Sequence, residues 1–217
     1  MLPRILLLRR SRGALWLLSV LVSLSCSPFS GSFEGKVYYK PSIEGEGKEQ
    51  IEPLLKMQDL SFSLYHKGDK VRIDRLRESM IVDYAKDSFY VLQPELKEYV
   101  ALPLHRGKED TLLPVVQALT EKRTILGHTC MGKRVEMPQD TQIFWEATDI
   151  TVPAAARKAY PIVFRGAEVQ GLPLRIEYTL PTLPLRLIYE ATEIEEENLQ
   201  DTLFQIPPSY KRISQNL

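Results

Sequence analysis

The feature that most constrains this chain is an alternation of hydrophobic and polar residues with a period of two, which begins at residue 33. Successive side chains of a β-strand point to opposite faces, so this period indicates strands with one buried and one solvated face. Val71 and Ile73, for example, alternate with three charged residues, and Gly68 and Asp69 just before them suit a tight hairpin turn. The sequence therefore predicts a mainly β protein.

Turns of only a few residues separate most of these alternating runs, which is typical of an antiparallel sheet that is strongly curved or closed. A chain of 217 residues has room for one such domain, and we expect it to occupy residues 33–217. The predicted strands are about eleven in number: residues 33–40, 60–66, 70–75, 79–84, 88–93, 98–104, 123–128, 132–137, 141–148, 172–180 and 184–194.

Two interruptions have a helical pattern. Residues 109–122 carry apolar residues at helical spacing after Asp110, a suitable N-cap. Residues 151–161 have Thr151 as a possible cap, Pro153 near the first turn and then a run of alanines. Both segments are short and apolar on one side, so we expect one or two short helices that cap the concave face of the sheet.

The N-terminus differs in composition from the rest of the chain. Four arginines lie within the first 12 residues, and residues 13–24 are uncharged and mostly apolar. A dozen apolar residues are too few to span a bilayer, which needs about 20. The pattern favours a signal peptide over residues 1–25, with an uncleaved single-pass anchor as the alternative.

Cys26 follows Ser25 in a stretch that resembles the lipobox of bacterial lipoproteins. The resemblance implies that Cys26 becomes the first residue of the mature protein and carries acyl chains, on a flexible tether of residues 26–32. Each buried methylene contributes about 0.8 kcal/mol, so several chains anchor a protein stably. Two alternatives remain open: removal of Cys26 by a cut near residues 30–32, or a disulfide with Cys130 in an oxidising compartment.

Ser27 directly after the cysteine resembles the pattern of lipoproteins sent to the outer membrane. We therefore expect an exported protein of the cell envelope, anchored by lipid in the outer membrane and facing the periplasm.

Motifs for chemistry are missing from the sequence. It contains no glycine-rich phosphate loop, HExxH, CxxC or GxSxG motif. His128 and Cys130 lie on one side of a predicted strand, but a metal site needs three or four ligands and nothing nearby supplies a third. Basic and acidic residues balance at 28 each, which gives no support for a nucleic-acid partner. We expect a protein that is not an enzyme and has no metal or cofactor.

Several segments in order, among them "LYHKGDKVRID", "ILGHTCMGKRVE", "IFWEATDI", "GLPLRIEY" and "DTLFQIPPSYKRI", resemble a bacterial family of exported domains of unknown function. That family is similar to the LolA and LolB superfamily of lipoprotein carriers. The resemblance implies an unclosed antiparallel β-barrel of about eleven strands, a cradle capped by helices, with an apolar cavity for acyl chains. It implies no catalytic residues, and the polar insertion at residues 41–56 departs from it.

We therefore expect a lipid-anchored envelope protein whose β-cradle binds an apolar ligand, such as acyl chains or a lipidated partner. The alternative is a structural or interaction lipoprotein whose interior is filled by its own side chains. Adjacent Phe144 and Trp145 should point to opposite faces, and charged residues such as Arg175 and Glu177 should face water. The candidates for the cavity lining are Phe62, Leu64, Val71, Ile73, Met80, Val82, Phe144, Leu174, Ile176 and Leu187.

The lipid anchor can be tested by the substitution Cys26→Ala. We expect the variant to incorporate no tagged palmitate in growing cells and to accumulate as unprocessed precursor or as a soluble species, because the acylated thiol is gone. Equal palmitate incorporation in the wild type and the variant would contradict lipidation at this position.

Overall fold

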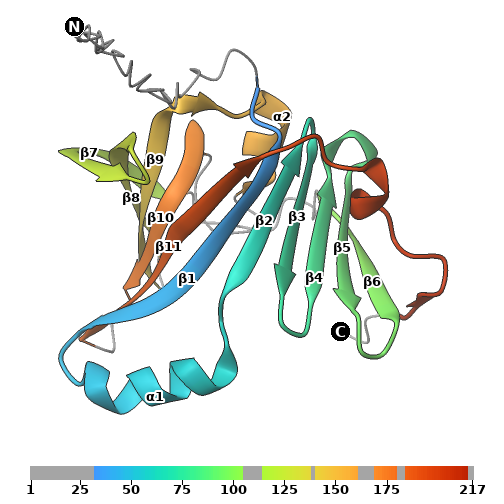
Figure 1. Ribbon diagram of the computed structural model, residues 1–217, viewed down its shortest axis with the longest axis horizontal. Coiled ribbons are helices and arrows are strands. Elements are labelled where there is room, and N and C mark those ends of the chain that lie inside the picture. The colour runs from blue at the N-terminus through green and yellow to red at the C-terminus, as the bar shows by residue number, and fades with distance from the viewer. Residues whose placement is uncertain (1–31, 105–113, 138–139, 161–168, 180–183, 215–217) are drawn as a thin grey trace, which may run out of the picture.

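The computed structural model describes residues 32–104, 114–137, 140–160, 169–179 and 184–214 (Figure 1). The predicted signal peptide, Cys26 and nearly all of the tether lie outside the described residues, as does the expected turn after residue 180. Within the described ranges, no helix has the length and apolar character needed to cross a membrane.

The described chain forms one sheet of twelve strands in the order β12-β6-β5-β4-β3-β2-β1-β11-β10-β9-β8-β7. All neighbouring strands are antiparallel except β12 and β6, which are parallel. The strands are β1 (Gly35–Gly45), β2 (Phe62–Lys67), β3 (Lys70–Arg75), β4 (Ser79–Asp83), β5 (Ser88–Gln93), β6 (Glu98–Pro103), β7 (Val115–Ile125), β8 (His128–Glu136), β9 (Thr141–Thr151), β10 (Gly171–Thr179), β11 (Leu185–Glu196) and β12 (Lys211–Arg212).

The sheet is not closed, because β7 and β12 stand at opposite ends of this order. Figure 1 shows it curving, with β7–β11 on one side, β2–β6 on the other and the long β1 between them. The predicted mainly β, unclosed antiparallel barrel is thus confirmed, with twelve strands in place of about eleven. The addition is β12, a two-residue strand near the C-terminus that alternation does not reveal.

Of the two predicted helices, the one at residues 109–122 is wrong. Its described part belongs to β7, a strand that is exposed along most of its length and so buries no apolar helical face. The valine- and threonine-containing β7 instead pairs with β8 at the edge of the sheet, which suits its β-branched residues. The other prediction is confirmed as the single turn α2 (Ala154–Arg157), which starts directly after Pro153.

The polar insertion at residues 41–56 has regular structure. Its first part is the C-terminal part of β1, and its second part belongs to helix α1 (Lys48–Gln58). None of the side chains of α1 is buried, although the helix contains Ile51, Leu54, Leu55 and Met57. Helix α1 therefore packs no apolar stripe into a core.

The inner face of the sheet carries the main hydrophobic core, which runs from β2–β4 across β1 to β9 and β10. Tyr39 on β1 crosses this core, and its hydroxyl donates a hydrogen bond of 2.6 Å to the carbonyl oxygen of Pro173 on β10. The central stretch of the inner face is therefore packed by side chains of the sheet itself.

The outer face of β2–β6 is covered by the C-terminal segment, residues 199–212. Leu199 and Phe204 bury their side chains against Ile81 and Leu92 on the outer face. Arg72 of β3 donates a hydrogen bond of 2.6 Å to the carbonyl oxygen of Leu203, which lies in the short 3₁₀ helix Asp201–Phe204. A solvated outer face was predicted here, but this segment shields the stem of Arg72, whose side chain is only 17% exposed.

His66 is buried on β2 with one of its two ring nitrogens satisfied. Nδ1 lies 2.7 Å from the carbonyl oxygen of Phe33, and Nε2 has no hydrogen-bond partner among the described residues. Burial lowers the pKa of His66 below its usual value, and this effect exceeds the opposing contributions of Phe33 and Glu34. The neutral ring is thus the form that the folded protein favours.

We therefore expect acid to destabilise the fold through His66. A lowered folded-state pKa leaves stability intact above the unfolded-state value of about 6.5 and reduces it as the pH falls below that value. His66→Asn, whose amide is neutral at every pH, should lose less thermal stability between pH 7.5 and pH 5.5 than the wild type. Equal losses in the wild type and in the variant would refute the assignment.

Candidate functional site

A pocket of about 470 Å³ opens at the β7–β9 end of the sheet, beside α2. Strands β7, β8 and β9 supply most of its wall, and the segment that leads into β10 completes it. Most of the lining is apolar, with Leu119, Met131, Ile150 and Val152 as the largest hydrophobic side chains. Its lining is more apolar than the linings of two other hollows, which lie beside α1.

Two glycines allow the backbone and side chains around this pocket to approach closely. A Cβ atom on Gly171 would lie 2.2 Å from the carbonyl oxygen of Ala147, so β10 can enter the sheet here only with glycine. A Cβ atom on Gly132 would lie 2.8 Å from Leu119 and 3.0 Å from Trp145. The pocket wall therefore depends on both residues.

A buried ion pair lies in the wall of the pocket. Lys133 Nζ on β8 is 2.9 Å from Glu146 Oε1 on β9, and their side chains are only 17% and 8% exposed. The other carboxylate oxygen of Glu146 accepts hydrogen bonds from the backbone N–H groups of Gln170, at 2.7 Å, and Gly171, at 3.2 Å. One oxygen of Glu146 therefore holds the start of β10, while the other pairs with Lys133.

Arg157 at the end of α2 contributes a second cation to the lining. Its Nη1 atom donates a hydrogen bond to the side-chain oxygen of Gln170. Its Nε atom is buried and has no partner among the described residues. Neighbouring Tyr160 is fully buried, and burial together with the negative charge of Glu146 raises the pKa of its hydroxyl well above the usual value.

The residues predicted to line a cavity lie elsewhere on the sheet, and none of them borders this pocket. Eight are buried in the main core, Met80 packs against that core, and Leu187 on β11 is half-buried. Their contact with a ligand remains a prediction. The ten are Phe62, Leu64, Val71, Ile73, Met80, Val82, Phe144, Leu174, Ile176 and Leu187.

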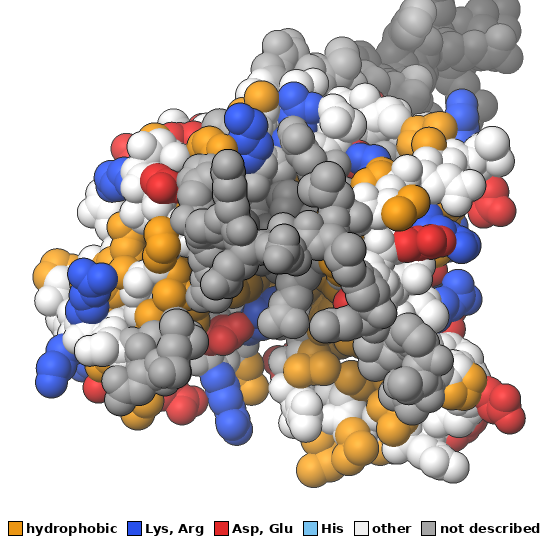
Figure 2. All heavy atoms as spheres, turned by 180° about the vertical axis from the view of Figure 1, so that it is seen from behind, with side chains coloured by type: hydrophobic (Ala, Val, Ile, Leu, Met, Phe, Trp, Pro, Cys, Tyr) orange, Lys and Arg blue, Asp and Glu red, His pale blue; other side chains and the backbone are white. Residues whose placement is uncertain are grey.

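A second apolar surface lies on the inner face of β5 and β6. Phe89 is opposite Leu102, and Val91 is opposite Val100, and all four side chains are half-buried. Figure 2 shows hydrophobic side chains gathered on this side of the molecule. The inner face is therefore closely packed in its central part. At β5 and β6 its apolar side chains are partly exposed.

The pair His128 and Cys130 does not form a nucleophilic or metal site. His128 Nδ1 lies 3.0 Å from a carboxylate oxygen of Asp149, a partner that the sequence did not indicate. Cys130 is a buried free thiol that contacts the backbone carbonyl of His128 instead of its ring. Burial raises the pKa of Cys130 to about 11, so the thiol stays protonated and unreactive at neutral pH. The described residues contain no group of three or more His, Cys, Asp or Glu side chains placed to hold a metal.

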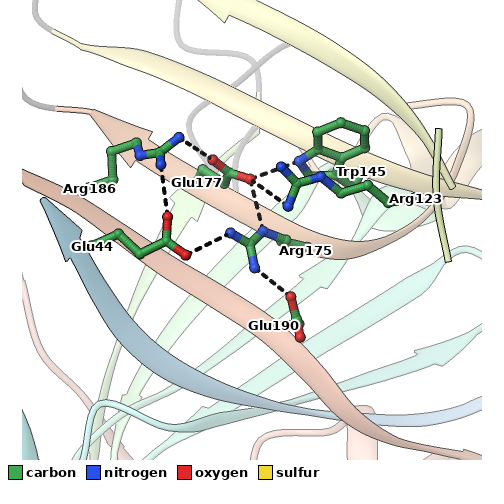
Figure 3. Close-up of polar contacts among 7 residues, drawn as sticks. All are labelled: Glu44, Arg123, Trp145, Arg175, Glu177, Arg186 and Glu190. Carbon is green, nitrogen blue, oxygen red and sulfur yellow. Dashed lines mark hydrogen bonds and ion pairs between the residues drawn. The ribbon is translucent and has the colours of Figure 1, made fainter. Parts of the chain in front are cut away.

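Phe144 and Trp145 point to opposite faces, as predicted, since Phe144 pairs with Ile176 of the inner core while Trp145 reaches Glu177 on the outer side. The prediction that Glu177 faces water is wrong: its side chain is 1% exposed. Arg175 Nε and Trp145 Nε1 donate to one of its oxygens at 2.8 and 2.9 Å, and Arg186 donates to the other at 3.2 Å (Figure 3).

The surrounding charges complete a balanced network. Arg123 adds a third guanidinium 3.8 Å from Glu177, and Glu44 and Glu190 balance the remaining positive charge (Figure 3). Burial alone would raise the pKa of Glu177, but the hydrogen bonds from Arg175 and Trp145 outweigh it and lower the pKa. With three cations, three anions and every carboxylate paired, the network joins β7, β9, β10, β11 and β1 and leaves little capacity for a ligand.

Comparisons with known proteins agree with this architecture. A family model described as "Domain of unknown function (DUF4412)" matches residues 33–210. Among curated proteins, none is significantly similar in sequence. The structure of PNGF-II has a TM-score of 0.50 and 13% identity, with 84% of this chain covered; the chain spans 31% of the length of that protein.

Two further solved structures resemble the fold over most of their own length. An uncharacterized conserved protein from Thermus thermophilus has a TM-score of 0.48 and 8% identity, with 82% of this chain and 89% of that chain covered. A LolA superfamily protein from Nitrosomonas europaea has a TM-score of 0.36 and 8% identity, with coverages of 80% and 90%. The predicted relation to a family of domains of unknown function is confirmed.

The role of the charged network can be tested by Glu177→Gln. The neutral side chain leaves buried Arg175 and its neighbours short of one negative charge, so we expect a loss of about 3 kcal/mol in the free energy of unfolding. The control Glu190→Gln removes a carboxylate that is 45% exposed and should cost less than about 1 kcal/mol. Urea unfolding at pH 7 measures both, and equal costs would show that Glu177 has no special place in the network.

Proposed function

This chain belongs to the DUF4412 family of domains of unknown function, and we propose that it is a lipid-anchored envelope protein whose unclosed barrel binds an apolar ligand. The ligand we propose is an acyl chain, free or as the lipid of a lipidated partner. The protein would act by binding and not by catalysis.

The observation that carries this proposal is the apolar pocket between β7–β9 and α2. Its volume of about 470 Å³ falls within the range of roughly 300–1,000 Å³ typical of small-molecule sites. Such sites combine a mostly hydrophobic wall with a few polar groups that orient the ligand, and Lys133, Glu146 and Arg157 are groups of that kind here. Each methylene of an acyl chain buried there would contribute about 0.8 kcal/mol.

The location rests on the N-terminal sequence. The basic head, the short apolar stretch and Ser25–Cys26 favour export and lipidation, and Ser27 favours the outer membrane. A lipid anchor would hold the domain at the membrane surface, where apolar ligands are concentrated.

One observation favours a second candidate, an interaction lipoprotein with a filled interior. The central part of the inner face is packed: Leu64, Val71, Val82, Leu174 and Ile176 are 1% exposed or less. These five buried residues leave little room for a ligand on the central inner face. If the pocket at the β7 edge also binds no ligand, the interaction lipoprotein is favoured.

A substitution that fills the pocket with a large side chain distinguishes the two candidate functions. Ala118 on β7 lines the pocket and is exposed, so Ala118→Trp should occupy its space without disturbing the core. Gln117 is its exposed neighbour on β7 and does not border the pocket, which makes Gln117→Trp a matched control.

We expect the wild type and Gln117→Trp to bind the neutral fluorophore Nile red. Oleyl alcohol should displace the fluorophore from both proteins by competing for the pocket. Ala118→Trp should bind the fluorophore about tenfold more weakly, which corresponds to 1.4 kcal/mol. Thermal unfolding of the three proteins checks that the fold is retained. Absence of Nile red binding, or equal binding in all three proteins, would reject the pocket as the site and favour the interaction protein.

A further inference from the structure

We propose that the pocket beside α2 selects an amphiphile with one negatively charged head, a carboxylate or a phosphate, and that Arg157 binds this head. The inference rests on the proposed function, since it names the chemical class of the ligand for the same pocket. It distinguishes an anionic lipid or fatty acid from an uncharged acyl chain.

The first step is the charge of the lining. Lys133 and Arg157 are positive, Glu146 is negative, and these are the charged side chains among the described residues that border the pocket. One positive charge is therefore left over. A singly charged anion would neutralise it in surroundings that are mostly apolar, where an unbalanced charge is unfavourable.

The second step identifies which cation is available. Lys133 lies 2.9 Å from Glu146, so its charge is already paired. Glu146 in turn accepts the backbone N–H groups of Gln170 and Gly171, which keeps it at the start of β10. Glu146 therefore belongs to the wall of the pocket, and among the described residues no ion pair joins Arg157 to a carboxylate.

The third step is the state of the Arg157 guanidinium. One arm is oriented by its hydrogen bond to the amide oxygen of Gln170, while the buried Nε has no acceptor among the described residues. A guanidinium presents its N–H groups as a planar fork that matches the two oxygens of a carboxylate or phosphate. The ligand head would bind the guanidinium where Arg157 lines the pocket, and the chain would lie along Leu119, Met131 and Ile150.

The test compares ligands that share one chain and differ in the head. Oleate, oleoyl lysophosphatidylglycerol and oleyl alcohol, each below its micelle concentration, displace Nile red from the wild type. We expect at least one anion to displace it at about tenfold lower concentration than the alcohol, the effect of one charge-assisted hydrogen bond. The stronger of the two anions tells whether a carboxylate or a phosphate is preferred.

Arg157→Gln should abolish the advantage of the anion over oleyl alcohol. Arg157→Lys, which keeps the charge and loses the planar fork, should retain only part of the advantage. Lys158→Gln is the matched control, because it removes the same charge from the exposed next residue, which does not line the pocket. It should behave as the wild type does.

The outcomes separate this inference from the proposed function. If all three ligands displace Nile red equally, or if Arg157→Gln keeps the advantage of the anion, the inference is overturned while the apolar site stands. If Nile red does not bind to the wild type at all, the proposed function fails together with the inference. Retained Nile red binding by each variant shows that the variant is folded.

Discussion

The pairing of β1 with both of its neighbours is the constraint on which the rest of the structure depends. Its residues 35–39 pair with β2, and its whole length pairs with β11, so β1 alone joins the β2–β6 side to the β7–β11 side. Cβ atoms at Gly35 and Gly45 would lie 2.1 Å from backbone oxygens of β11 and the residue before it, which explains glycine at both ends. The hydroxyl of Tyr39 then ties β1 across the core to β10.

The outer face of the curved sheet is covered in two ways, one on each side of β1. On the β2–β6 side the C-terminal segment buries Leu199 and Phe204 and accepts a hydrogen bond from Arg72. On the other side the network around Glu177 cross-links five strands through charges that are all paired. Neither arrangement leaves an obvious place for a ligand. The binding that we propose would therefore take place on the inner face or at the β7 edge.

The sequence predicted the elements that have one buried and one solvated face. Residues 70–75, with strict alternation, are β3 from end to end. It failed where that condition does not hold: β7 is exposed on both faces, α1 buries no side chain, and β12 is too short for a pattern. Glu177 was expected to face water because it alternates with the apolar residues of its strand. Its partners Arg186 and Arg123 are brought to it only by the sheet, so the sequence did not reveal its burial.

The pocket also escaped prediction, because its lining comes from five separated parts of the chain and from both faces of strands. One signal was present: Glu146 is a lone acidic residue in the apolar run of residues 143–147, and a buried carboxylate demands partners such as Lys133. By contrast, the sequence does not distinguish Gly132 and Gly171 from other glycines in strands. Their role becomes visible only when the atoms packed against them are known.

The position of the pocket at the edge of the sheet bears on how a ligand would exchange. A cavity enclosed by the main core would open only if Phe144, Leu174 and their neighbours separated, at the cost of much of the burial that stabilises the domain. Within the described chain β7 pairs with β8 alone, and the pairing is interrupted between Ala118 and Lys122 beside the pocket. An element with one partner and exposed side chains opens at lower free energy than the core does. Binding at this edge would therefore let the barrel stay folded while a ligand enters or leaves, as reversible uptake of the proposed apolar ligand requires.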